Sequence, residues 1–159
     1  MTGLYAQLAE MNMPFQGAKL AVLAGNRLPV ILRDDRPDIA YPDFWDLPGG
    51  GREGDEGPLD CALRETVEEL SLEIPPASVV WGHPFREGAR RQWFFAARVP
   101  DSTLASVRLG NEGQCFEIMQ TAAFLTHPKA IPHLRDRLKV FLSSDEFYEK
   151  PPADRSGGR

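Results

Sequence analysis

Hydrophobic and polar positions alternate along the chain in short blocks that predict strands, turns and helices. Apolar runs separated by segments rich in Gly, Pro and Asn are typical of strands. The first two runs flank Gly25-Asn26, which favours a β-hairpin between them. A charged turn, 86–91, joins two longer runs, and the polar segment 34–43 predicts a loop. The predicted strands are 18–24, 28–33, 44–47, 78–85, 92–99, 104–109 and 115–119.

The strongest helical pattern covers residues 58–70. Pro58 suits the first turn of a helix, and Pro75-Pro76 prevents the helix from continuing. Weaker patterns predict helices at 2–12 and 131–143. The positions of helix 58–70 that repeat every three or four residues, and that we expect to pack on the core, are Leu59, Leu63, Thr66 and Leu70.

Length and composition are those of a single soluble domain. The 159 residues are 42% hydrophobic and 26% charged, which suffices for one core and is too short for two. The segment after Lys150 has the composition of a disordered tail. We therefore expect one domain, 1–150, and a disordered tail at 151–159.

Several classes of protein are disfavoured. No apolar stretch approaches the roughly 20 residues that span a bilayer, and the N-terminus lacks a signal-peptide pattern, so we expect a cytoplasmic protein without a membrane partner. The two cysteines, Cys61 and Cys115, are too few for a disulfide framework or a zinc site. A net charge of −5 disfavours a nucleic-acid polymer as partner, but allows anionic small molecules if metal ions neutralise the site.

Helix 58–70 carries a cluster of acidic residues. At about 100° per residue, Glu65, Glu68 and Glu69 share a sector roughly 100° wide, away from the apolar sector. Crowding like charges costs a few tenths of a kcal/mol per pair. The cluster is either a solvated face that Arg64 partly compensates, or a site for a hard cation such as Mg²⁺, which prefers carboxylate oxygens.

Three glycines, Gly49, Gly50 and Gly51, precede this helix. Successive glycines are entropically costly, and they favour a sharp turn or a close approach of the backbone to a ligand. A glycine loop that leads into a helix also presents N–H groups to anions. A plain tight turn is the alternative. Because Glu56 adds a further acidic residue between the glycines and the helix, the combination favours a site for metal and phosphate.

The segment 50–72 resembles the Nudix box. That box is Gly, five residues, Glu, seven residues, Arg-Glu, an aliphatic, any residue, Glu-Glu, any residue, Gly and an aliphatic. Thr66 and Ser71 depart from it, and neither is a metal-binding position. Segment 44–50 is also similar to the strand that leads into the box in many Nudix (MutT-like) hydrolases. The matching residues are Gly50, Glu56, Arg64, Glu65, Glu68, Glu69 and Leu72.

The resemblance implies an α/β fold, namely the Nudix α/β/α sandwich with a mixed central sheet. It also implies Mg²⁺-dependent hydrolysis, with Mn²⁺ as a substitute, of a pyrophosphate bond in a nucleoside-diphosphate-linked substrate. Arg64 would orient the glutamates by pairing with Glu68 or Glu56, unless it is an ordinary surface arginine. The implied roles are metal ligands for Glu65, Glu68 and Glu69, with Glu69 also catalytic; phosphate binding for Gly49, Gly50 and Gly51; and support of the box for Glu56.

The general base is a separate question, because the resemblance places it either in the box or in a later loop. The later candidate is Glu112, between Gly110 and Gly113, where the backbone has the freedom to close over a substrate. A solvated turn glutamate is the alternative, and Glu117 ranks behind.

Substrate recognition has weaker signals. Most aromatic residues are better explained as core than as stacking surfaces for a base; they are Trp45, Trp81, Phe85, Trp93 and Phe94. Arg86, Arg90 and Arg91 lie in one turn, where a solvated hairpin tip is favoured over contact with phosphates.

Segments 83–85 and 93–95 are similar to those of members that cleave nucleoside triphosphates, which favours triphosphates or damaged nucleotides as substrates. The expected partner is thus a small-molecule nucleotide, and a homodimer is left open. The alternative is a non-catalytic Nudix-fold nucleotide sensor or binding module. Such a protein would usually have lost glutamates from the box, whereas all four are present here.

Overall fold

The computed structural model describes residues 13–145. The helix expected at 2–12 and the tail expected at 151–159 lie outside the described residues. In chain order the elements are β1 (Gly17–Leu23), β2 (Arg27–Leu32), β3 (Trp45–Asp46), β4 (Gly49–Gly51), α2 (Pro58–Leu70), the 3₁₀ helix η1 (Pro76–Ser78), β5 (Val79–Glu87), β6 (Arg90–Arg98), α3 (Asp101–Leu104), β7 (Cys115–Gln120), α4 (Thr121–Thr126) and α5 (Pro132–Asp145).

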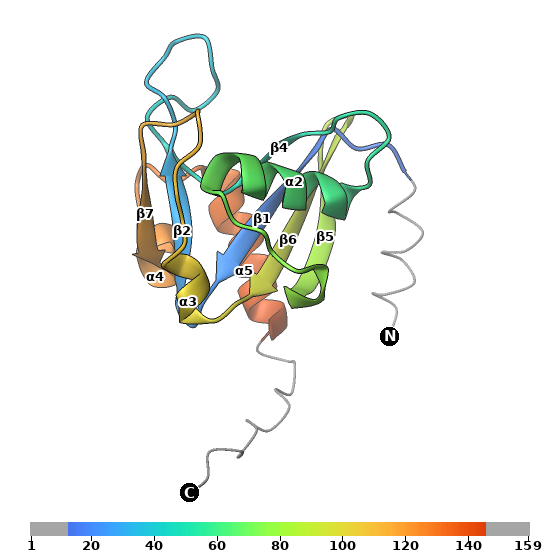
Figure 1. Ribbon diagram of the computed structural model, residues 1–159. Helices are drawn as coiled ribbons and strands as arrows, with labels where there is room; N and C mark the ends of the chain where they lie inside the picture. The colour runs from blue at the N-terminus through green and yellow to red at the C-terminus, as the bar shows by residue number, and fades with distance from the viewer. Residues whose placement is uncertain (1–12, 146–159) are drawn as a thin grey trace, which may run out of the picture.

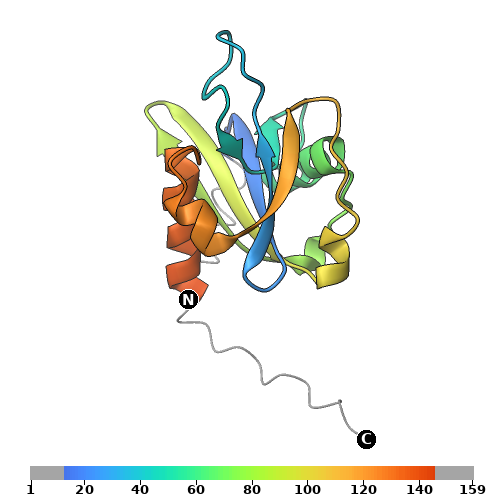
Figure 2. The ribbon, with the colours of Figure 1, turned by 90° about the vertical axis from the view of Figure 1, so that its left-hand side faces the viewer.

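The strands form two sheets between two layers of helix. One sheet has the order β4-β1-β6-β5, in which β1 and β6 are parallel and the other pairs antiparallel. The other has the order β3-β2-β7 and is antiparallel. Helix α2 covers one side and α5 the other (Figures 1 and 2). The expected α/β class with a mixed sheet and an α/β/α arrangement is therefore confirmed.

The hairpin expected across Gly25-Asn26 exists only at its tip. Ala24 and Arg27 exchange two backbone hydrogen bonds, with N···O distances of 2.9 and 3.1 Å. Beyond them the strands separate, because β1 pairs with β4 and β6 while β2 pairs with β3 and β7. The local turn was thus predicted correctly, whereas the pairing of two full strands was wrong.

The strand expected at 104–109 is also absent. Pro100 precedes the short helix α3, and the chain then runs along the C-terminal end of α2. The N–H of Arg108 donates to the Leu70 carbonyl at 3.0 Å, and that of Gly110 to the Glu69 carbonyl at 2.8 Å. These amides satisfy carbonyls that every helix leaves unpaired at its end, so they are not available to a sheet.

The core lies on both sides of the larger sheet. Along β6, Trp93 and Phe95 face α2, whereas Phe94 faces α5. Trp45 is buried, and Trp81 and Phe85 are half-buried against the α5 side. The aromatic residues therefore occupy core positions, as their pattern in the sequence predicted. No helix within residues 13–145 combines the length and the apolarity needed to cross a bilayer.

Candidate active site

Helix α2 begins and ends at the residues that the sequence predicted. Pro58 stands at its first turn, and Ser71 ends it in the left-handed conformation (φ 57°), with its N–H donating to Val67. The buried side is rotated from the expected one, because Leu59 and Leu63 are only partly buried. Small side chains face the sheet instead, which lets the helix lie close to β4; the buried residues are Pro58, Cys61, Ala62, Thr66 and Leu70.

The three glycines form strand β4 rather than a turn into the helix, and six residues separate them from Pro58. Gly49 has φ +143°, and a Cβ there would lie 2.1 Å from the Ala18 carbonyl oxygen. A Cβ on Gly50 would lie 2.7 Å from the carboxyl carbon of Glu65. Close packing thus explains two of the glycines, and phosphate binding by Gly49, Gly50 and Gly51 stays a prediction.

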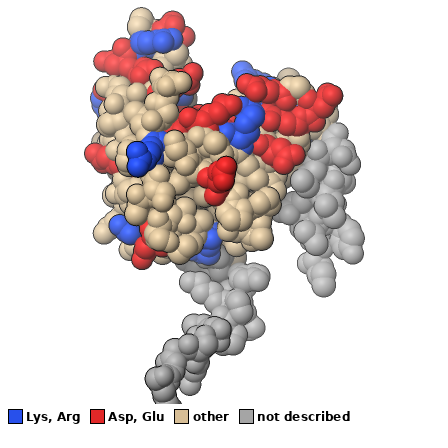
Figure 3. All heavy atoms as spheres, in the orientation of Figure 1, with Lys and Arg blue, Asp and Glu red and all other residues tan. Residues whose placement is uncertain are grey.

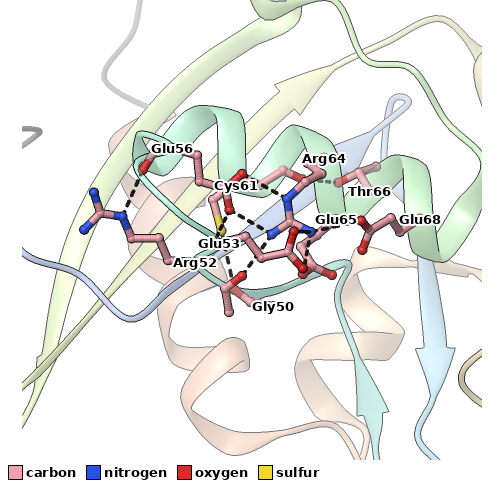
Figure 4. Close-up of polar contacts among 11 residues, drawn as sticks. Gly50, Arg52, Glu53, Glu56, Cys61, Arg64, Glu65, Thr66 and Glu68 are labelled. Atoms are coloured by element: carbon pink, nitrogen blue, oxygen red, sulfur yellow. Dashed lines mark hydrogen bonds and ion pairs between the residues drawn. The ribbon is translucent and has the colours of Figure 1, made fainter.

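Arg64 is the centre of a polar network (Figure 4). Its guanidinium group donates to both carboxylate oxygens of Glu56, at 2.9 and 2.8 Å. It also donates to Glu65 at 3.1 Å, to Glu68 at 3.0 Å and to the Gly51 carbonyl at 2.9 Å. Both partners expected for Arg64 are therefore present, together with Glu65 and the backbone of β4.

This network holds Glu56 strongly in its charged form. The hydrogen bonds from Arg64 lower the pKa of Glu56 to about 2, and the carboxylates in turn raise the pKa of Arg64. Glu56 also accepts the N–H of Glu53 at 2.8 Å, which closes the loop before the helix. The supporting role expected for Glu56 fits this position, since its carboxylate connects the loop to the helix.

Glu69 has the opposite electrostatic environment. Burial, together with the nearby carboxylates of Asp46 and Glu65, raises the pKa of Glu69 to about 8, against the opposing charge of Lys19. Within the described residues, no arginine bonds to Glu69. A carboxylate held among other carboxylates is stabilised by any cation that binds beside it.

Glu69 lines a cleft of about 460 Å³ beside α2. The residues that line it are Glu53, Glu65, Glu68, Glu69, Asn111 and Glu112. Figure 3 shows Asp and Glu side chains gathered over α2 and the loop that leads into it. The structure therefore places Glu112 on the same cleft as the acidic sector of the helix, although Glu112 lies 43 positions after Glu69 in the sequence.

The cleft offers the oxygen donors that Mg²⁺ and Mn²⁺ prefer. In the arrangement that the structure shows for residues 13–145, no three Asp, Glu, His or Cys side chains converge closely enough to hold a metal ion. The reason is that Glu65 and Glu68 turn toward Arg64. The donor chemistry of the cleft fits a divalent cation.

Loop 110–114, which carries Glu112, is fixed at both ends. Gly110 packs on α2 so closely that a Cβ would lie 2.1 Å from the Glu68 carbonyl oxygen. At the other end, Gln114 donates its backbone N–H to Leu32 at 2.8 Å. Its side-chain amide donates to the Arg33 carbonyl at 2.7 Å and to the Asp43 carboxylate at 3.0 Å. These contacts hold the two ends of the loop, and closure of Glu112 over a substrate stays a prediction.

A second cleft, of about 160 Å³, adjoins the first. Both include Glu69 and Glu112; its other lining residues are Ile31, Arg33, Asp34, Arg36, Ile39, Asp46 and Gly113. Buried Asp46 accepts from Arg33 at 2.9 Å and from Lys19 at 3.1 Å. Sequence reasoning missed these basic residues. The only local signal was a charged residue, Arg33, at the end of an apolar run.

Comparison with known proteins agrees with the geometry. The family model of the NUDIX domain matches residues 15–141. An RNA pyrophosphohydrolase from Acidiphilium cryptum (strain JF-5) is 36% identical over an alignment 109 residues long, which covers 59% of this chain and 63% of that protein. The chain thus spans less than two thirds of the length of this relative.

Solved structures share the fold at low sequence identity. A MutT protein from Methanosarcina mazei Go1 has a TM-score of 0.64 at 18% identity, covering 85% of this chain and 98% of that one. A bifunctional NMN adenylyltransferase/ADP ribose pyrophosphatase from Francisella tularensis, solved with AMP and a Mn ion, has a TM-score of 0.67 at 15% identity, covering 88% and 45%. With the family match over most of the chain and three glutamates of the box on one cleft, this protein belongs to the Nudix hydrolase family.

Proposed function

We propose that this protein catalyses Mg²⁺-dependent hydrolysis of a pyrophosphate bond in a nucleoside-diphosphate-linked substrate, with nucleoside triphosphates or damaged nucleotides favoured. The observation that carries the proposal is the cleft on which Glu65, Glu68 and Glu69 of α2 meet Glu112. These carboxylates are crowded, and no arginine within the described residues bonds to Glu69, so the cleft is suited to a cation. The bound cation would in turn allow an anionic substrate to approach.

Glu65, Glu68 and Glu69 would hold the metal. Bound Mg²⁺, which Mn²⁺ can replace, would lower the pKa of a water molecule and neutralise charge on the phosphate oxygens. Arg64 holds Glu65 and Glu68 on one side of the helix, and it keeps Glu56 charged. Those contacts orient the carboxylates before substrate arrives, as partners of metal ligands generally do.

Glu112 is suited to the role of general base. Its carboxylate would accept a proton as the water oxygen attacks phosphorus, while the bond from that phosphorus to the bridging oxygen breaks. The bridging oxygen departs with the leaving group, which is pyrophosphate or the nucleoside monophosphate according to the phosphorus attacked. Loop 110–114 is held by Glu69 and Leu32, so Glu112 stays beside the acidic sector.

The adjoining cleft is the region that we propose for the rest of the nucleotide. Arg33 and Arg36 offer guanidinium groups to phosphates, and Ile31 and Ile39 offer apolar contact. The glycines of β4 remain candidates for phosphate binding. The proposed partner is a small nucleotide, and neither a membrane nor a nucleic-acid polymer is expected to bind. The protein is proposed to act in the cytoplasm, with residues 1–150 as its domain. A homodimer is left open.

The test is a panel of substrates with Mg²⁺, Mn²⁺ or EDTA. It includes nucleoside triphosphates, oxidised triphosphates, ADP-ribose and a 5′-triphosphorylated RNA oligonucleotide, the last two because relatives are named for such substrates. We expect metal-dependent release of a mononucleotide from at least one triphosphate, and water labelled with ¹⁸O identifies the phosphorus attacked. Saturable nucleotide binding without turnover of any substrate would instead indicate a binding module. Turnover in EDTA would contradict the proposed requirement for a metal ion.

A further inference from the structure

The β5–β6 hairpin carries three arginines at its tip, far along the sequence from the acidic box. They surround a pocket of about 260 Å³ whose lining residues are Pro14, Gln16, Arg86, Gly88, Ala89, Arg90 and Arg91. None of these residues lines either cleft of the active site. The pocket is therefore a separate feature of the molecule.

Arg91 differs from the solvated arginine that its turn predicted. Its side chain is buried, with 7% of the residue exposed, and among residues 13–145 its Nε has no hydrogen-bond acceptor. One guanidinium nitrogen, Nη1, donates to the Pro14 carbonyl at 3.2 Å. The backbone N–H of Arg91 donates to the Gln16 side chain at 2.5 Å, which fixes the strand beneath the side chain. A buried guanidinium group bonded to a single neutral carbonyl is energetically costly.

The neighbouring charges do not compensate Arg91. Arg86 is its direct partner across the β5–β6 ladder, and like charges at such positions repel. Among residues 13–145, Arg86, Arg90 and Arg91 have no ion pair with a carboxylate within 4.0 Å. Glu87, the acidic residue of the hairpin, pairs instead with Arg137 of α5 at 2.6 Å. Glu56, in the next pocket, is held by Arg64.

We propose that this pocket binds a phosphate group. Arg91 lines the pocket with a guanidinium group whose Nε lacks an acceptor among residues 13–145, and planar guanidinium groups match phosphate geometry. Arg86 and Arg90 are exposed at the rim and supply further donors. A doubly charged phosphate would relieve both the repulsion between Arg86 and Arg91 and the cost of burying Arg91. The phosphate group can belong to inorganic phosphate or to a nucleotide.

The experiment measures binding of inorganic phosphate and, separately, of AMP to the full chain in EDTA, which keeps metal ions out of the acidic cleft. Calorimetry and the melting temperature are compared with sodium chloride at equal ionic strength. We expect saturable binding of phosphate and a higher melting temperature than in chloride. Equal affinity for both ligands identifies the phosphate alone as the recognised group, whereas tighter binding of AMP identifies a nucleotide.

Arg91→Gln and Arg86→Gln should each weaken phosphate binding roughly tenfold or more, because each removes charged hydrogen-bond donors. Arg108→Gln, an exposed arginine outside the pocket, should bind phosphate as the wild type does. Arg86→Gln changes an exposed side chain, so it keeps the test decisive if Arg91→Gln fails to fold. The proposal is overturned if phosphate binds no better than chloride, or if Arg86→Gln retains wild-type affinity.

Discussion

The two walls of the active-site cleft are built in different ways. One wall is α2 with the loop that leads into it. There Arg64 donates hydrogen bonds to three carboxylates, Glu56, Glu65 and Glu68, and all four residues lie within the thirteen residues 56–68. The other wall is loop 110–114, whose position depends on segments distant in sequence. Its side-chain contact from Gln114 reaches Asp43, 71 residues away.

This difference separates what periodicity determines from what tertiary packing determines. On α2, the helical repeat alone brings charged side chains together. The loop wall has no such repeat, and hydrogen bonds to the end of α2 and to β2 set its geometry. The helix wall should therefore resist small changes in its surroundings, while the loop wall should respond to single contacts.

The largest effect is expected on the helix wall, from Glu69→Gln. The substitution removes charge without volume at the half-buried carboxylate of both clefts. Metal ions supply several kcal/mol of transition-state stabilisation, so kcat should fall by about 10³-fold or more. Steady-state kinetics at saturating Mg²⁺ measure it. Glu73→Gln, just beyond the helix, is the control, and near wild-type turnover of Glu69→Gln would refute the assignment.

On the loop wall, Glu112→Gln should lower kcat by roughly 10²–10⁴-fold, the range for a general base. Metal affinity of the free enzyme should stay unchanged, because Glu112 acts on the attacking water rather than on the resting metal site. Glu117→Gln serves as the control, since Glu117 is exposed on β7. A parallel loss of metal affinity would make Glu112 a ligand, and full activity would make it a solvated turn residue.

The accuracy of the sequence predictions follows the same division. Helix α2 and its Arg64–Glu pairs could be predicted because every residue involved lies within one local segment. The pairing of Asp46 with Lys19 and Arg33 could not, since it joins three elements that the sequence does not place together.

The failed predictions have the same physical origin. Residues 104–109 are apolar enough for a strand, but Arg108, together with Gly110 just beyond them, donates its amide to the end of α2. Arg91 was expected at a solvated tip, yet it is buried beneath its neighbours, and no local pattern reports that burial. Local periodicity thus predicts which residues form an element, and only tertiary contacts determine what its ends touch.

A smaller effect on the helix wall is expected from Arg64→Lys. Lysine keeps the charge but cannot donate to both oxygens of Glu56 while it also reaches Glu65 and Glu68. Loss of such orienting partners typically costs 10–100-fold, so kcat/KM should fall by about that factor and the Mg²⁺ requirement should rise. Arg52→Lys, which loses a contact to the Glu56 carbonyl, should change activity little. Equal effects would mean that the paired donors of Arg64 are unimportant.

Glu56→Gln tests the stability of the same wall. The pKa of Glu56 is about 2 in the folded protein against an ordinary value of 4.5. Its ion pair therefore stabilises the fold fully above about pH 4.5, and this stabilisation is lost as pH falls toward 2. In urea unfolding with EDTA at pH 7, Glu56→Gln should cost about 1–3 kcal/mol, and the difference from wild type should shrink at pH 3.

Glu53→Gln is the matched control for this stability measurement. Glu53 lies 3.6 Å from the same arginine, and its side chain is 69% exposed. Exposed ion pairs contribute about 0–1 kcal/mol. A loss as large as that of Glu56→Gln would show that burial of the carboxylate does not matter here.

The smallest effect is expected from Gln114→Met on the loop wall. This substitution tests whether a single contact sets the geometry of that wall. Methionine keeps the length of the side chain but cannot donate to the Arg33 carbonyl or to Asp43. The backbone bond to Leu32 remains, so the loop should shift rather than unfold. A typical hydrogen bond contributes about 1 kcal/mol, hence kcat should fall about 3–10-fold.

If Gln114 acts by positioning Glu112, its substitution should have almost no further effect in a Glu112→Gln background, because there is no base left to misplace. Lys129→Met is the control, since it removes the other partner of Asp43 and leaves both side-chain bonds of Gln114 intact. It should retain near wild-type kcat. The same 3–10-fold loss of kcat in the wild-type and Glu112→Gln backgrounds would instead assign Gln114 to the substrate cleft beside Arg33. The contact between Gly110 and α2 would then be what sets the geometry of the loop wall.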